Sequence, residues 1–219
     1  MSTPEVNRLL MIAMAPEAAH IPAILGGEAL QRVDSLRWTS CCGNLLIGVS
    51  GVGGHNMAAM TSKLLLENPG IREVANFGSA GAYLESGLEV GDCCMVRRVA
   101  KWDLFLDIED FEQFFTQKEL SAGPAGSEEL PLHDCNSGCS FSREMNRRRP
   151  GFPPADLEDM ELYSLAALCQ LHELPLWSMK FVSNIVSDSS IEDFAQGFVP
   201  NVKQASKLMS DLLVQWLSE

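Results

Sequence analysis

Residues 45–66, LLIGVSGVGGHNMAAMTSKLLL, carry the pattern that decides the fold: a short apolar run, a glycine-rich turn and a helical run. Leu45–Val49 predicts a buried strand, and Asn56–Leu66 predicts the helix that follows it. The turn at Ser50–Gly54 has neither the GxGxxG spacing of a dinucleotide site nor the lysine of a P-loop. Its free backbone N–H groups at a helix N-terminus nevertheless suit an anion or a polar ligand.

The same alternation of strand and helix extends on both sides of this unit. Further strands are expected at Leu9–Met14, Leu36–Thr39, Glu73–Phe77, Cys93–Val99 and Trp177–Val186, and helices at 15–25, Asp159–His172 and Val202–Leu217. Residues 121–130 and 143–154 have the composition of irregular loops. We therefore expect one α/β domain over residues 1–219, a three-layer α/β/α sandwich with a central mixed, mostly parallel twisted sheet.

The charge balance and the cysteines limit the class of partner. The net charge is −13, from 16 Lys+Arg against 29 Asp+Glu, which disfavours nucleic acid and anionic membranes as partners. The chain has 7 cysteines in an arrangement without a CxxC pair, which indicates reduced thiols in a cytoplasmic protein and neither a disulfide framework nor a metal site. We expect no cofactor.

Polar or glycine-rich clusters follow several predicted strands. They are Ala13–Glu17, Ser50–Gly54, Asn76–Gly81 and Ser187-Asp188. Each alone has a structural explanation, such as a tight turn or a helix cap. In open α/β sheets, however, ligands bind beyond the carboxyl ends of the strands, so the recurrence of these clusters predicts a common binding site.

The order and spacing of these clusters resemble the nucleoside phosphorylase and nucleosidase superfamily, and within it the methylthioadenosine/S-adenosylhomocysteine nucleosidase branch. The resemblance covers residues 8–217 and is poor between 104 and 134. It lies in the following motifs: Ala13-Met14-Ala15-Pro16-Glu17, Ser50–Gly53 with Asn56-Met57-Ala58-Ala59, Asn76–Gly81 with Gly91-Asp92, Met160-Glu161 through Cys169, and Val186-Ser187-Asp188.

The resemblance implies hydrolysis of the N-glycosidic bond of a 6-aminopurine nucleoside, with release of adenine. Departure of adenine requires protonation of N7, which a carboxylic acid with a raised pKa can supply. By resemblance this acid is Asp188, positioned by Ser79, and Glu17 activates the attacking water. Glu161 would bind the ribose hydroxyls, and Met160 would lie against the sugar.

The resemblance also assigns the walls of the site. Phe141 would stack on the purine, and the backbone of Ser142 would read its edge. The glycine-rich segment that ends at Gly81 would let the backbone approach the substrate closely. The apolar pocket for the 5′ substituent would be formed by Met14, Val52 and Phe198, with Phe194 as an alternative to Phe198.

Three places depart from the family pattern, and the first is the usual Glu-Glu-Glu run, which is reduced to Ala15-Pro16-Glu17 here. The nucleosidase branch has an arginine four residues before its acidic aspartate, where this chain has Asn184, and Cys139 stands where the base-stacking motif has an aspartate. Three alternatives therefore stay open. They are a purine nucleoside phosphorylase, a futalosine or aminofutalosine hydrolase, and a nucleoside-binding relative without activity. Enzymes that prefer a 6-oxopurine tend to carry asparagine at the position assigned to Asp188.

The resemblance also implies a homodimer, in which the partner chain lines the 5′ pocket. The segment Trp102–Phe115 holds four phenylalanines and is a candidate for this contact. Its alternative role is ordinary core. The expected partners are thus a small nucleoside, water and a second copy of the chain.

Overall fold

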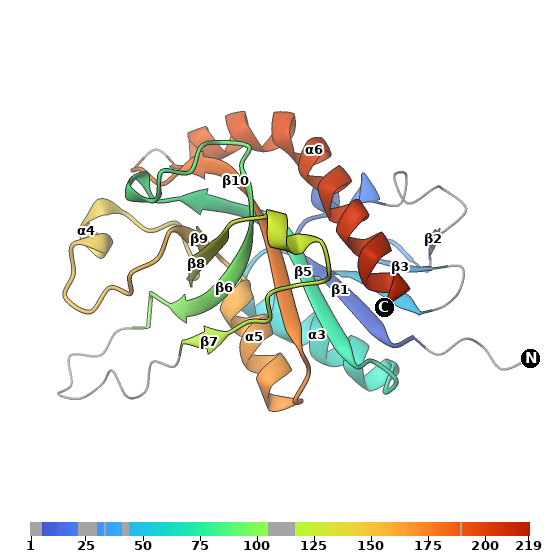
Figure 1. The fold of residues 1–219 in the computed structure, drawn as a ribbon. Coiled ribbons are helices and arrows are strands. Elements are labelled where there is room, and N and C mark those ends of the chain that lie inside the picture. Colours follow the sequence, from blue (N-terminus) through green and yellow to red (C-terminus); the bar gives the residue numbers. More distant parts are fainter. Residues whose placement is uncertain (1–5, 22–29, 33, 41–43, 105–116, 189) are drawn as a thin grey trace, which may run out of the picture.

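The computed structural model describes residues 6–21, 30–32, 34–40, 44–104, 117–188 and 190–219. Figure 1 shows a central sheet with helices on both faces. In chain order the elements are β1 (Arg8–Ile12), α1 (Ala15–Ala18), β2 (Leu30–Arg32), β3 (Arg37–Ser40), β4 (Leu45–Val49), α3 (Gly54–Glu67), β5 (Glu73–Ala82), η1 (Leu84–Ser86), β6 (Cys93–Lys101), β7 (Lys118–Glu119), η3 (Ser127–Glu129), β8 (Leu132–Ser137), α4 (Glu144–Arg147), β9 (Leu157–Asp159), α5 (Leu162–Leu171), β10 (Leu176–Ile185) and α6 (Ser190–Ser218).

Strand β5 is the hub of the sheet. It pairs in parallel with β1 through its first part and with β10 from Val74 to Ala82, and its last residues also pair antiparallel with β9. From β10 the pairing continues through β6, β8 and β9 back to β5, so these strands form a closed circuit. On the other side, β1 pairs with β4, and β3 and β2 follow at the edge. The carboxyl ends of β1, β5 and β10 therefore lie together.

Two apolar clusters cover the two faces of the sheet. One packs Met57 and Leu64 of α3 with Leu165 of α5 against the sheet, and the other packs Met209 and Leu213 of α6 against the opposite face. In Figure 1, α3 and α5 lie below the sheet and the long helix α6 crosses above it. The expected three-layer α/β fold with a mixed sheet is thus confirmed.

Several element boundaries differ from those predicted. Strand β5 runs unbroken through Gly78–Gly81, because those residues pair with β10, so this stretch is not a turn. The helix expected from Asp159 begins at Leu162, because Leu157–Asp159 pairs with β5 and β8 as strand β9. Helix α1 ends at Ala18, and most of the remainder of the helix expected over 15–25 lies outside the described residues.

Two further boundaries also differ. The segment expected to be irregular at 143–154 contains the short helix α4, and the final helix begins well before Val202, at Ser190. Most of the candidate dimer segment Trp102–Phe115 lies outside the described residues. In the described part of the chain, every helix is too short or too polar to cross a membrane.

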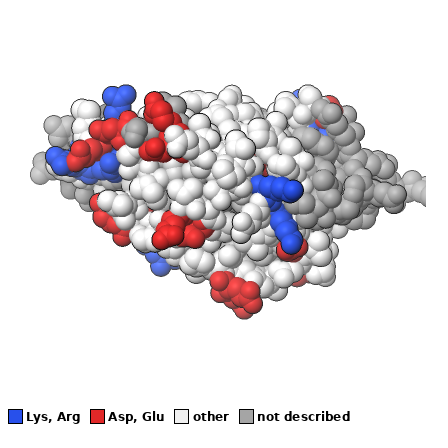
Figure 2. Space-filling view, turned by 90° about the horizontal axis from the view of Figure 1, so that it is seen from above, with Lys and Arg blue, Asp and Glu red and all other residues white. Residues whose placement is uncertain are grey.

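On the face of the molecule where α6 lies, charged side chains are scattered between uncharged ones (Figure 2). Basic and acidic groups often lie together, and in α4 the guanidinium of Arg148 pairs with Glu144. The neighbouring Arg147 and Arg149 donate to the backbone carbonyls of Ser142 and Trp102, at 3.3 and 2.8 Å. Arg147, Arg148 and Arg149 thus all bond to other groups of the protein.

Candidate functional site

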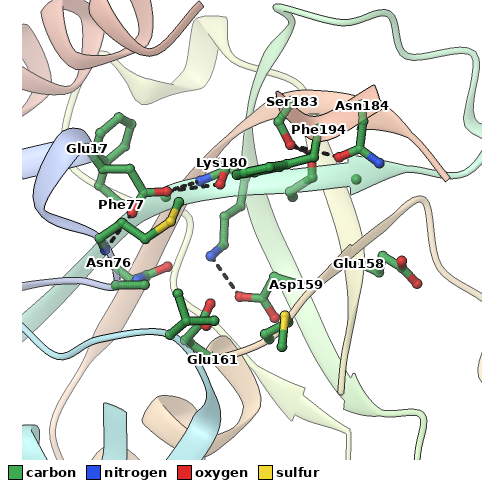
Figure 3. A pocket seen from close by; sticks show the side chains of 18 of the residues that line it. Glu17, Asn76, Phe77, Glu158, Asp159, Glu161, Lys180, Ser183, Asn184 and Phe194 are labelled. Atoms are coloured by element: carbon green, nitrogen blue, oxygen red, sulfur yellow. Dashed lines mark hydrogen bonds and ion pairs between the residues drawn. The ribbon is translucent and has the colours of Figure 1, made fainter. Parts of the chain in front are cut away.

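A cavity of about 180 Å³ opens at the carboxyl ends of β1, β5 and β10 (Figure 3). Both buried charges and aromatic rings form its walls. The lining residues are Ala13, Met14, Glu17, Val52, Asn76, Phe77, Gly78, Ser79, Ala80, Gly81, Phe141, Glu158, Asp159, Met160, Glu161, Lys180, Ser183, Asn184 and Phe194.

Glu17 is held rigidly at one end of the cavity. Its Oε2 accepts from the backbone N–H of Met14 at 3.0 Å, where it caps the short helix α1. Its Oε1 accepts from both the backbone N–H and the hydroxyl of Ser79, at 2.8 and 2.9 Å. Burial raises the pKa of Glu17, and the donors from Ser79 and Met14 and the charge of Lys180 oppose this rise. The result is a fixed carboxylate with raised basicity.

Glu161 lies at the turn that precedes α5. Its Oε1 accepts from the backbone N–H of Gly53 at 2.6 Å, so the glycine-rich turn after β4 is tied to the start of α5. Burial and the nearby charge of Asp159 raise the pKa of Glu161 to about 7. Met160 and Val52, from the same two segments, also line the cavity.

A buried ion pair lies between these carboxylates. Nζ of Lys180, on β10, donates to Oδ2 of Asp159 at 2.7 Å, and both side chains are almost completely buried. Burial alone would lower the pKa of Lys180, but the charges of Asp159 and Glu161 outweigh it and raise the pKa. Figure 3 shows the lysine reaching across the cavity toward Asp159. Lys180 therefore stays charged and balances part of the negative charge of the site.

Glu158 and Asn184 lie at the other end of the cavity. The Oε2 atom of Glu158 accepts from the Tyr83 hydroxyl at 3.0 Å, and its Oε1 accepts from the backbone N–H of Ser142 at 3.2 Å. Burial raises the pKa of Glu158, and these two donors act against the rise. Asn184 follows an irregularity in β10 at Ser183, whose Oγ lies 2.9 Å from Asn184 Oδ1.

Aromatic and sulfur-containing side chains form the apolar walls. The ring of Phe141 lies 6.3 Å from that of Phe194, centroid to centroid, and both rings face the cavity. Met14, Met160 and Phe77 complete the apolar lining. Flat apolar walls of this kind suit a planar heterocycle and an apolar substituent.

The structure brings most of the predicted site residues together. Eight of them line the cavity: Glu17, Glu161, Met160, Ser79, Gly81, Phe141, Met14 and Val52. Ser142 is buried behind it, with its N–H bonded to Glu158. Phe198 is also set back, because its ring packs on Phe181 and on Phe194, and Phe194 takes the position at the wall.

Asp188, the predicted general acid, does not belong to this lining. Its side chain is exposed, and its Oδ1 accepts from the backbone N–H of Glu144 at 3.2 Å. The last residue that β10 delivers to the cavity is Asn184, which is 1% exposed. Asn184 and Asp188 are four residues apart in the chain.

The sequence-based assignment missed several lining residues. Lys180, Asp159 and Glu158 were not assigned a role, nor were Asn76 and Phe77 individually. One signal was available: Lys180 is a charge within a predicted buried strand, and a buried charge requires a partner. Glu158 gave no such signal, because acidic residues before a helix are common.

Comparisons with known proteins agree with this architecture. A family model described as the phosphorylase superfamily matches residues 8–217. The 5′-methylthioadenosine/S-adenosylhomocysteine nucleosidase of Baumannia cicadellinicola subsp. Homalodisca coagulata is 27% identical over 181 residues, which cover 75% of this chain and 78% of the relative. The nucleosidase of the same name from Anoxybacillus flavithermus is 26% identical over 196 residues, which cover 80% of this chain and 82% of that protein.

Solved structures share the fold. The crystal structure of the 5′-methylthioadenosine/S-adenosylhomocysteine nucleosidase of Helicobacter pylori, with butyl-thio-DADMe-Immucillin-A, superimposes with a TM-score of 0.78 at 16% identity and covers 95% of this chain and 98% of its own. The futalosine hydrolase of the same organism gives a TM-score of 0.76 at 16% identity, with 97% and 98% covered. At these identities the structural likeness establishes the fold alone.

Proposed function

This chain belongs to the phosphorylase superfamily, as the sequence motifs predicted, and from this premise we propose that it hydrolyses the N-ribosyl bond of purine nucleosides. The observation that carries the proposal is that Glu17 and Glu161 both line one cavity with aromatic walls. Its curated relatives support adenosine-type nucleosides as substrates, since they are named as nucleosidases of methylthioadenosine and S-adenosylhomocysteine.

Glu17 is the general base in this proposal. Cleavage transfers the oxygen of water to C1′ of the ribose, and Glu17 takes a proton from that water. The C1′–N9 electron pair leaves with the base, which departs neutral because it has gained a proton at N7 from solvent. A base works best when its pKa approaches the working pH, and burial raises the pKa of Glu17. The donors from Met14 and Ser79 fix the direction of the carboxylate before substrate arrives.

Glu161 binds the ribose hydroxyls. A carboxylate is an acceptor for two hydroxyl donors at once, and Oε2 of Glu161 is not used by Gly53, which bonds to Oε1. Met160 lies beside it and offers an apolar surface to the sugar. Phe141 stacks on the base, and Met14, Val52 and Phe194 contact the 5′ substituent.

Water, and not phosphate, is the nucleophile in this proposal. Among the lining residues that the structure describes, Lys180 is the single cation, and its ammonium is committed to Asp159. Arg97 and Arg98 pair with Asp134. A phosphate dianion beside Glu17, Asp159 and Glu161 would meet net repulsion.

The compartment and the assembly state are further parts of the proposal. Thiols at Cys93, Cys94, Cys135, Cys139 and Cys169 are free, which supports a reducing cytoplasm. Val52 is 47% exposed at the cavity, which supports a homodimer whose partner covers the 5′ end. One continuous sheet supports a single domain over residues 1–219.

The test is release of free base, followed by chromatography, from methylthioadenosine, S-adenosylhomocysteine, adenosine and inosine, with and without phosphate. We expect release without phosphate, and a loss of about 10²–10⁴-fold in Glu17→Gln. The exposed Glu128→Gln is the matched control. Release that requires phosphate, or full activity in Glu17→Gln, would refute the proposal.

A further inference from the structure

Lys101, Asp103 and Cys139 meet where two parallel strands end. Lys101 and Ser137, the last residues of β6 and β8, pair with each other. Just beyond this pair, Nζ of Lys101 donates to Sγ of Cys139 at 3.4 Å and forms an ion pair with Oδ1 of Asp103 at 2.9 Å. Oδ2 of Asp103 accepts from the backbone N–H of Cys139 at 2.6 Å. A thiol, an ammonium and a carboxylate thus form a cluster outside the lining of the cavity.

Cys139 is the exposed member of the cysteines that the structure describes. The others are buried or half-buried, and they are Cys93, Cys94, Cys135 and Cys169. The half-buried Cys93 is the nearest comparison, because burial and the charge of Asp92 raise its pKa to about 11 and its thiol donates to the carbonyl of Gly91 at 3.8 Å. Sγ of Cys139 instead accepts from an ammonium. The two thiols therefore differ both in exposure and in the direction of their hydrogen bonds.

Lys101 keeps its charge beside this thiol. Burial lowers the pKa of Lys101, but the hydrogen bonds and charges of Asp103 and Cys139 outweigh burial and raise it. An ammonium that donates to sulfur stabilises the thiolate, which is the nucleophilic form of cysteine. Reactive cysteines in proteins are typically accessible to solvent and lie beside such a cation.

An unused donor lies next to the thiol. The side chain of Trp102 is 4% exposed, and its Nε1–H has no hydrogen-bond partner among the described residues. It faces the backbone beside Cys139, since a Cβ on Gly138 would lie 2.1 Å from Nε1. A buried donor without a partner is unfavourable, and an acceptor on a group attached at Cys139 would satisfy it. This observation does not depend on the cysteine and also favours a bound group at this place.

We propose that Cys139, with Lys101 as its cationic partner, is a reversible modification site that exchanges with small disulfides. The Cys139 thiolate attacks one sulfur of the disulfide and forms a new S–S bond with it. The original S–S bond breaks, and the other half leaves as a thiolate that takes a proton from solvent. Sγ is oxidised and the leaving sulfur is reduced, so no further oxidant takes part. A small free thiol reverses the step by the same exchange.

The modification reaches the cavity through the loop after β8. Phe141, two residues beyond Cys139, lines the cavity, and the contacts of Cys139 with Lys101 and Asp103 hold the start of the loop. A disulfide sulfur carries no charge for the ammonium of Lys101 to bond, so the mixed disulfide removes one of these contacts. We therefore expect weaker nucleoside binding by the modified protein, a consequence that rests on the proposed function.

The first test maps the modified cysteines by mass spectrometry while the reduced, unmodified protein reacts with dithiobis(nitrobenzoate), a small disulfide. We expect Cys139 to react about tenfold faster than Cys93 or more, and faster than the same cysteine in a synthetic peptide of residues 136–142. Mapping separates Cys139 from Cys41 and Cys42, which lie outside the described residues. Reaction of Cys93 first, or of Cys139 no faster than in the peptide, would overturn the proposal.

Variants of Lys101 separate its charge from the fold of the loop. Lys101→Met should slow the reaction of Cys139 by about three- to tenfold, because the thiolate that the cation stabilises is also somewhat less nucleophilic. Lys101→Arg retains a cation and should retain most of the rate. Lys63→Met, at an exposed lysine of α3, is the matched control. An unchanged rate in a folded Lys101→Met, or an equal loss in Lys101→Arg, would overturn the role of the cation.

Calorimetry with methylthioadenosine compares the reduced protein with the mixed disulfide, and Cys139→Ser treated in the same way is the control. We expect binding to weaken by about two- to tenfold on modification, the range of one lost hydrogen bond, and to stay unchanged when the variant is treated. Equal binding by both forms of the unmodified sequence would overturn the link to the cavity. If neither form binds, the proposed function fails, while the mapped reactivity of Cys139 still decides the modification site.

Discussion

Nζ of Lys180 lies 2.7 Å from Oδ2 of Asp159 in the interior of the cavity, and the side chains are 2% and 0% exposed. Around this pair lie Glu17 and Glu161, whose carboxyl pKa values are both raised first of all by burial. One buried cation therefore moderates the repulsion among several carboxylates. The stability of the protein and the protonation of these two glutamates both depend on it.

Replacement of Lys180 by methionine should lower the free energy of unfolding by about 3–5 kcal/mol, because Asp159 would remain as a buried charge without a partner. Urea denaturation at pH 8 measures this loss. Lys63→Met is the control, since Lys63 is exposed and lies 3.8 Å from Glu67, and it should cost about 0–1 kcal/mol. A loss in Lys180→Met no larger than in this control would mean that water reaches the ion pair.

Glu161 should make the protein less stable as the pH rises. Its pKa in the folded state is about 7, above the ordinary value of 4.5, so folding favours the protonated form. This contribution is complete below about pH 4.5 and is lost as the pH rises through about 7. Glu161→Gln should therefore raise the free energy of unfolding at pH 8, by up to about 3 kcal/mol, and change it little at pH 4.5.

Urea titrations of both proteins at the two pH values check this prediction, with Glu128→Gln as the exposed control. The same substitution should raise KM for the nucleoside, because in the proposed function Glu161 is the charged acceptor of the ribose hydroxyls. A variant that is less stable than the parent at pH 8 would contradict the argument.

Ser79→Ala should move the acidic limb of the kcat/KM profile to higher pH. The hydroxyl donates to Glu17 Oε1 at 2.9 Å and so lowers the pKa of that carboxyl. Without it the pKa of Glu17 rises further, and the ionised base is lost at a higher pH. A hydrogen bond to a charged group corresponds to a shift of about one pH unit. Ser218→Ala, on the surface, should leave the profile in place.

Asp188→Asn tests whether Asp188 is the general acid, as the sequence motif implies, or has no such role, as its position outside the cavity lining indicates. Because the carboxylate is exposed and accepts from Glu144 N, the substitution should lower kcat/KM by less than about tenfold, or about 1.4 kcal/mol. Base release by the purified variant, compared with Asn184→Ala, provides the measurement. A loss of several orders of magnitude in Asp188→Asn would instead support the acid role that the motif implied.

Much of this architecture follows from local sequence. Apolar runs such as Leu45–Val49 predict strands, because residues buried on both faces must be apolar throughout. The Glu17 and Glu161 positions could be assigned because each stands at a fixed distance from a strand end or a helix start, where short-range backbone geometry directs the side chain. The boundaries of β5 and α5 could not be assigned in this way. Pairing with distant strands extended β5 and shortened the helix expected at α5.

The base end of the site was decided by tertiary structure alone. Alternation along β10 gives no sign of the extra residue at Ser183, because a bulge depends on how the strand registers with its partner β5. That register delivers Asn184 to the cavity and leaves Asp188 outside it. Glu158 reaches the same cavity only because β9 pairs with the end of β5. The sequence by itself determined which strands and helices form and that Glu17 and Glu161 belong to the site. Contacts between residues far apart in the chain determined which side chains line the rest of the cavity.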